Sequence, residues 1–147
     1  MNSRSPLLVI AIVLALAGPG ALAQGTGAAD KWLSVAKTDN QEAFVNGSSI
    51  AVVGEQLEAR VKQNFALPQP SAKKGKTYLS SRTTYRFDCA QRRMAMTEVR
   101  TYAGSDLQGE PVQKATSSDK NLQWLDAPDS TVFGELLDYV CGRSPGG

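Results

Sequence analysis

The sequence predicts an α+β domain in which an antiparallel β-sheet of about six strands packs against one C-terminal helix. Two patterns lead to this expectation. Polar and apolar residues alternate along 57–65 and 77–89, which is typical of antiparallel strands with one buried face. In 126–141 the period becomes helical, and apolar residues gather on one side of the helical wheel. We therefore expect this helix to pack its apolar side on one face of the sheet.

The elements follow in chain order. Residues 31–36 form the first expected strand, and Asn46-Gly47 between two β-prone runs predicts a hairpin of 42–45 and 48–53. Residues 57–65 form the next strand; a short helix is the alternative, because Glu58 and Lys62 also have helical i,i+4 spacing. The remaining expected strands are 77–89, 94–102, 112–115 and 122–125.

Turn-forming residues separate these segments. Prolines, a glycine and three lysines predict a loop over 67–76, and turns are expected at 103–111 and 117–121. Pro128 precedes the helix, whose start is capped by Asp129, Ser130 or Thr131, and Gly142 marks its end.

Residues 1–23 have the pattern of a signal peptide. Arg4 precedes an uninterrupted apolar run, 7–17, and Ala21, Leu22 and Ala23 fit a cleavage site. The run is shorter than the roughly 20 residues of a membrane-spanning helix. We therefore expect cleavage after Ala23 and a periplasmic or secreted protein, with a retained membrane anchor as the alternative. No cysteine lies near the cleavage site, so no lipid anchor is expected.

The remaining chain has the length of one domain. We expect a flexible lead-in at 24–30, a single domain at 31–142 and a disordered tail at 143–147. The formal net charge of the whole chain is only +2, which does not favour a nucleic-acid partner.

The two cysteines, Cys89 and Cys141, decide between a scaffold and a reactive site. Arg92 and Arg93 follow Cys89 closely, and positive charge favours the reactive thiolate. However, Cys89 falls on the apolar side of its strand and Cys141 at the edge of the apolar side of the helix. Docking the helix brings the thiols together, and an oxidising compartment favours a disulfide. A reactive thiol and two unpaired thiols are the alternatives.

Residue types also limit the chemistry. The chain has no histidine, which removes histidine bases, nucleophile pairs and metal ligands, and two cysteines are too few for a four-thiolate zinc site. Haem or metal binding would need Met94, Met96 or tyrosines, and we expect the methionines to pack on the sheet. Paired-acid chemistry stays open for the carboxylates, although Asp129 and Glu135 more simply suit the helix start, where negative charge meets the helix dipole. The carboxylates considered for this chemistry are Asp126, Asp129, Glu135 and Asp138. We expect no cofactor and no catalytic residue.

Basic residues form the one candidate binding site. A patch for an anionic ligand, either a sulfated glycan or an extracellular matrix protein, would combine the basic loop with the arginines after Cys89; simple solubility is the alternative. Its residues are Lys73, Lys74, Lys76, Arg92 and Arg93. On the solvent side of the sheet, arginines 82, 86 and 100 alternate with acidic residues, which indicates a mixed, solvated face.

Several short motifs resemble those of the surface-adhesin protein E family. They are Trp32 in the first strand, AFVNGSSI, YRFDCAQRR, QWL and the closing PDSTVFGELLDYVC. The resemblance implies a sheet with a C-terminal helix joined to it by a disulfide, adhesion to matrix components such as laminin and vitronectin, and a homodimer. Unlike the family's lipoprotein members, this chain lacks the lipoprotein cysteine. A structural subunit of the cell envelope that pairs through a sheet edge is the alternative function.

Overall fold

The computed structural model describes residues 30–143. The expected signal peptide, nearly all of the expected lead-in and residues 144–147 lie outside the described residues. The elements are β1 Trp32–Lys37, β2 Gln41–Asn46, η1 Gly47–Ser49, β3 Ala51–Val53, β4 Gln56–Pro70, β5 Thr77–Asp88, β6 Arg93–Tyr102, β7 Pro111–Thr116, η2 Asp119–Asn121, β8 Trp124–Asp126 and α1 Val132–Cys141.

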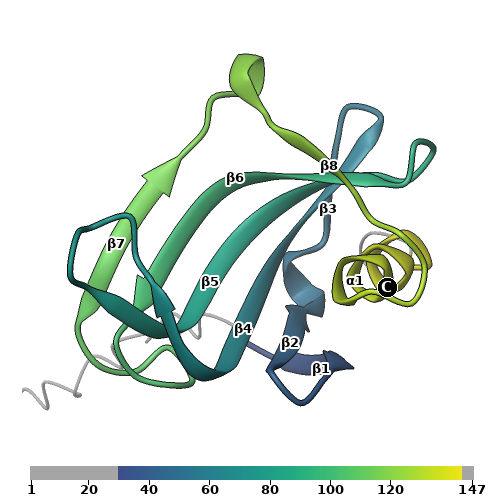
Figure 1. Ribbon diagram of the computed structural model, residues 1–147. Coiled ribbons are helices and arrows are strands. Elements are labelled where there is room, and N and C mark those ends of the chain that lie inside the picture. Colours follow the sequence, from purple (N-terminus) through teal and green to yellow (C-terminus); the bar gives the residue numbers. More distant parts are fainter. Residues whose placement is uncertain (1–29, 144–147) are drawn as a thin grey trace, which may run out of the picture.

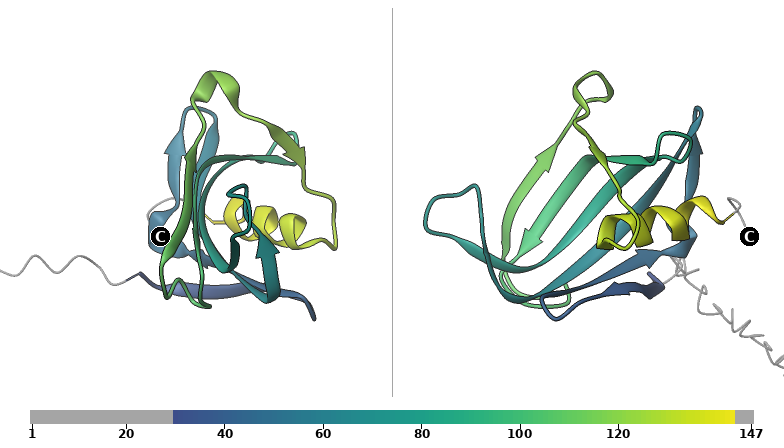
Figure 2. Two further views of the ribbon diagram at one scale, coloured as in Figure 1. Left: turned by 60° about the vertical axis from the view of Figure 1, so that its left-hand side comes forward. Right: turned by 45° about the vertical axis from the view of Figure 1, so that its right-hand side comes forward.

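All eight strands belong to one antiparallel sheet, so the α+β prediction is confirmed with more strands than the six expected. The order is β1-β2-β4-β5-β6-β7, with β3 added beside β4 and β8 beside β6. The sheet is strongly curved, and α1 lies on its concave side (Figures 1 and 2). No helix within residues 30–143 is long and apolar enough to cross a membrane.

The core lies between α1 and the concave face of the sheet. Residues alternate along β5, so that Thr83, Tyr85 and Phe87 are buried and their neighbours are only half-buried. From the helix, Leu136 and Val140 are fully buried against this face. The expected alternation and the expected apolar side of the helix are therefore both confirmed.

The hairpin expected at Asn46-Gly47 is wrong. β2 pairs with β1 and β4, and β3 pairs with β4, so the two expected arms never pair with each other. Asn46 instead caps the short helix η1, where its Oδ1 accepts hydrogen bonds from the backbone N–H of Ser48 (3.2 Å) and from the Ser48 hydroxyl (2.7 Å). The tight turn lies one element later, at Gly54, whose φ of +63° suits glycine.

The side-chain amide of Asn46 also anchors the beginning of the domain. Its Nδ2 donates to Asp30 Oδ1 at 2.6 Å, and Arg60 pairs with the same carboxylate at 3.1 Å. The last residue of the expected lead-in is thus held on the sheet.

The strand expected at 57–65 is confirmed, but β4 continues to Pro70, so the expected loop shrinks to residues 71–76. The pairing of β4 with β5 shifts between Asn64 and Gln69, which lets the far end of this hairpin bend. The 71–76 turn reaches β7, where the Ser71 hydroxyl and the Ala72 N–H donate to Gln113 Oε1 at 2.9 and 3.1 Å. The end of the β4–β5 hairpin therefore lies against β7, the last strand in the order of the sheet (Figure 1).

Thr131, one of the three expected caps, begins the helix α1. The Thr131 hydroxyl oxygen accepts a hydrogen bond from the backbone N–H of Gly134 at 3.0 Å and donates to the Pro128 carbonyl at 2.7 Å. Asp129 and Ser130 do not serve as the cap, and Asp129 binds an arginine instead.

Candidate functional site

Cys89 and Cys141 form a disulfide with their Cα atoms 5.8 Å apart, as predicted. Cys89 follows the last residue of β5, and Cys141 is the last residue of α1. No cysteine within residues 30–143 is free, so the positive charge beside Cys89 does not activate a thiol. The bond fixes the end of the helix to one end of the sheet.

Arg92 strengthens the same attachment. Its Nη2 donates to Asp129 Oδ1 at 2.6 Å, and its Nη1 donates to Asp138 Oδ1 at 2.7 Å. The hydrogen bond with Asp138 raises the pKa of the Arg92 guanidinium. The backbone takes part as well, because the Ala127 N–H donates to the Arg92 carbonyl at 3.0 Å. Two candidate catalytic acids are thus engaged in holding the helix.

Arg93 is also engaged. It forms an ion pair with Asp88 at 3.0 Å, and its guanidinium lies 4.9 Å from the centre of the Trp124 ring. Both arginines of the expected patch are therefore held by neighbouring side chains.

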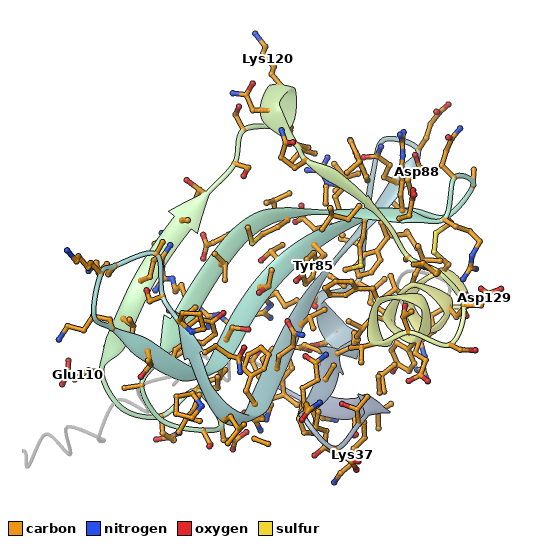
Figure 3. The ribbon with its side chains drawn as sticks, viewed as in Figure 1. Lys37, Tyr85, Asp88, Glu110, Lys120 and Asp129 are labelled. Atoms are coloured by element: carbon orange, nitrogen blue, oxygen red, sulfur yellow. A yellow bond between two sulfur atoms is a disulfide. The ribbon has the colours of Figure 1, made fainter. Side chains whose placement is uncertain are left out.

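The three lysines of the expected patch lie at the other end of β5. Lys73, Lys74 and Lys76 are all exposed in the 71–76 turn, which precedes β5, whereas Arg92 and Arg93 come after it. Figure 3 shows this separation: Glu110, near the lysine turn, lies at one end of the sheet, and Asp88 and Asp129 lie at the other. The structure does not bring the five residues together, and anion binding by the lysines stays a prediction.

The register of the sheet aligns a different set of basic residues, and sequence reasoning placed Arg82 and Arg100 on the solvent side without recognising this alignment. Lys62 of β4 lies opposite Arg82 of β5. Arg82 lies opposite Arg100 of β6, and Arg100 lies opposite Lys114 of β7. These four residues, the cation row, cross the convex face, because successive residues of a strand alternate between faces and the neighbours Val61 and Thr83 are buried on the concave side. Strands are about 4.8 Å apart, so the Cα atoms of the row recur at roughly 5 Å intervals.

Only part of this charge is neutralised within residues 30–143. Glu98 Oε1 lies 3.3 Å from Arg100 Nε, and its Oε2 lies 3.7 Å from Lys114 Nζ. Arg82 has no ion-pair partner in this part of the chain. The expected mixed face is present in part, because Arg86 pairs with Glu58 and Asp119, and Arg100 pairs with Glu98.

The inner end of the row is buried. The Lys62 side chain is only 8% exposed, and its ammonium lies 4.3 Å above the Phe44 ring and pairs with Asp106. This hydrogen bond lowers the pKa of the Asp106 carboxyl. The Asp106 N–H also donates to Asn64 Oδ1 at 2.8 Å, so the β6–β7 loop covers Lys62. The exposed part of the row is thus Arg82, Arg100 and Lys114.

Two shallow pockets adjoin the outer end of the row, and Lys73 lines both. The first, of about 230 Å³, also receives Arg100, Tyr102 and Lys114, with Pro111, Val112 and Gln113. The second, of about 320 Å³, lies between the 71–76 turn and the start of β7, where Lys76 and Glu110 line it. One lysine of the expected patch therefore meets two cations of the row.

The other candidate ligands are dispersed or packed. Met94 is buried on the helix side of β6, and Met96 is partly exposed on the same side. Within residues 30–143, no group of three histidine, cysteine or acidic side chains is placed to hold a metal ion.

The fold resembles solved structures of Haemophilus influenzae protein E. One covers 79% of this chain and 87% of its own, with 14% identity and a TM-score of 0.54. A second, from crystal form II, covers 76% and 87% with 15% identity and the same TM-score of 0.54. At this identity the likeness concerns the fold alone.

No curated protein sequence matches the chain. The family model described as surface-adhesin protein E matches residues 32–142, from the first residue of β1 to the residue after α1. This match spans the whole antiparallel sheet, the helix and both cysteines. The chain therefore belongs to the surface-adhesin protein E family.

Proposed function

We propose that this protein is an exported, non-catalytic adhesin-like domain that binds components of the extracellular matrix. The family match over residues 32–142 is the observation that carries the proposal. Export follows from the signal-peptide pattern in residues 1–23. Laminin, vitronectin and sulfated glycans are the candidate ligands.

The use of the polar residues supports a binding role. Asp129 and Asp138, which sequence reasoning considered as catalytic acids, hold Arg92, and the thiols form a disulfide. The two carboxylates and the two thiols, which are the groups best suited to catalysis, thus serve to attach the helix. Exposed lysines and arginines around β7 remain available to a ligand.

A structural subunit that pairs through a sheet edge remains the alternative, as does a homodimer. The edge strands β1 and β7 have six residues each, and β7 carries Pro111 and Lys114. Short edges, proline and lysine all disfavour pairing between sheet edges. Edge pairing therefore has less support than surface recognition of a ligand.

The test is direct binding of the oxidised mature chain, from Gln24 onward, to immobilised laminin, vitronectin and a heparin–albumin conjugate, with albumin as the blank. We expect saturable binding to at least one matrix component by biolayer interferometry. Binding no stronger than that to albumin on every surface would contradict the proposed function.

A further inference from the structure

The cation row is expected to lower the stability of the fold. Like charges directly opposite one another on neighbouring strands oppose folding, and the register places three such pairs in succession. Within residues 30–143 only Glu98 and Asp106 pair with these four cations. Residues that a fold retains at such a cost commonly serve a ligand rather than stability.

We propose that the exposed part of the row, Arg82, Arg100 and Lys114, together with Lys73, binds the sulfate groups of a linear sulfated glycan. This inference rests on the proposed adhesive function and names the chemistry of one matrix ligand and the residues that bind it.

The side chains suit sulfate. A guanidinium presents paired N–H donors that match two oxygens of one tetrahedral anion, and Arg82 and Arg100 supply two such groups side by side. Lys114 is 52% exposed on its side chain and adds a point charge at the edge strand. Cations on adjacent strands favour a ligand that itself carries closely spaced anions.

The direction of the row distinguishes a glycan from an acidic peptide. A peptide that binds a sheet adds to its edge and runs along the strand, because it uses unpaired backbone groups. The row instead crosses β5, β6 and β7, and the backbone of β5 and β6 is already paired on both sides. A sulfated glycan carries its anions as substituents of the sugar rings, so it does not need unpaired backbone groups of the sheet in order to bind.

The pocket at the end of the row adds a place for a ring. Tyr102, Pro111 and Val112 supply apolar and aromatic surface, while Lys73, Arg100 and Lys114 surround it with positive charge. A saccharide ring combines an apolar face of C–H bonds with a charged rim in the same way. The pocket is therefore chemically suited to one sulfated ring, and the row to the sulfates that follow.

The test compares two triple variants with the same change in net charge. The row variant carries Arg82→Gln, Arg100→Gln and Lys114→Gln; the control carries Lys31→Gln, Lys37→Gln and Lys120→Gln, all exposed positions away from the row. Binding of a fluorescent heparin octasaccharide is measured by anisotropy in 0.15 M NaCl, about the physiological ionic strength. We expect the row variant to bind about 10- to 100-fold more weakly, from three lost charge-assisted contacts.

A folded row variant is itself expected, because it removes opposed like charges and loses only the two partly exposed ion pairs with Glu98. Cooperative thermal unfolding near the wild-type midpoint verifies this. The single Arg82→Gln variant breaks no ion pair within residues 30–143 and provides a second measurement, with a loss of about 3- to 10-fold.

Each other outcome overturns the inference in a recognisable way. Equal weakening in both triple variants would show binding by general charge only. Equally tight binding of polyglutamate of matched charge would exclude selectivity for a sulfated glycan. A wild-type protein that binds laminin or vitronectin but no glycan would remove this inference and leave the proposed function, whereas one that binds none of them would remove both.

Discussion

Gly134 of α1 packs directly on the backbone carbonyl of Pro128, and a Cβ atom at residue 134 would clash with that oxygen. Because both partners are backbone, the clash requires the helix to move. We expect Gly134→Ala to lower the free energy of unfolding by about 1–3 kcal/mol, although alanine is the better helix former. Urea denaturation measures this. Glu135→Ala, at the next and exposed position, is the control and should change stability by no more than about 1 kcal/mol.

Removal of the disulfide by Cys89→Ala with Cys141→Ala should cost about 4 kcal/mol, because the bond closes a long loop between residues separated by 52 positions. The comparison is urea denaturation of the oxidised protein and the double variant. Intact mass after alkylation of the native wild-type protein should show no modified thiol. Two alkylated thiols would contradict the bond.

Arg92→Gln should lower the free energy of unfolding only slightly, and by less in high salt, because the side chain is partly exposed and its partners are exposed carboxylates. The same variant, and Arg93→Gln, should keep wild-type binding of heparin. A large loss of glycan binding in either variant would show that these arginines contact the ligand, as the expected patch proposed.

Alkaline stability should depend on Tyr85. Burial raises the pKa of the Tyr85 hydroxyl from 10.0 to about 12. Its folded-state pKa lies above the unfolded value, so its contribution is complete below pH 10 and is lost as the pH rises to about 12. The loss is on the order of 2–3 kcal/mol. Tyr85→Phe should lose less stability than the wild type over this window; equal losses in urea titrations would refute the assignment.

Acid should weaken the attachment of the β6–β7 loop. Asp106 has a folded-state pKa below its ordinary 3.8, caused first by its hydrogen bond with Lys62. Its contribution is therefore present above pH 4 and is lost as the pH falls through the folded-state pKa. Asp106→Asn should be less stable than the wild type at pH 7, and the difference should shrink as the pH falls below the ordinary pKa of 3.8. A difference that is constant with pH would argue against this ion pair.

Sequence patterns predicted the strands and the helix whose formation depends on neighbouring residues in the chain. Alternation in β4 and β5 reports a sheet with one buried face, and the change of period reports α1. Thr131 could be anticipated as one of three caps. The Asn46 turn was misjudged because the same residue type favours a hairpin turn and a helix cap, and the neighbouring strands decide between them.

The cation row needed information that no single strand contains. The alternation along 57–65 places Lys62 on the polar side of its strand, but the loop carrying Asp106, far along the sequence, buries it. The alignment of Arg82 with Arg100 and Lys114 depends on pairing registers interrupted by irregularities on both sides of β6. A shift of one residue would have sent these side chains to opposite faces.

The position of α1 after all eight strands has a consequence for export. A chain that crosses a membrane from its N-terminus delivers the sheet first, and the concave face with Val45, Val61 and Phe87 then has no cover until Leu136 and Val140 arrive. Oxidation of Cys89 to its native partner also waits for this last element. Completion of the core therefore requires the last element of the chain, so in an exported chain, as proposed, native packing would follow the translocation of α1.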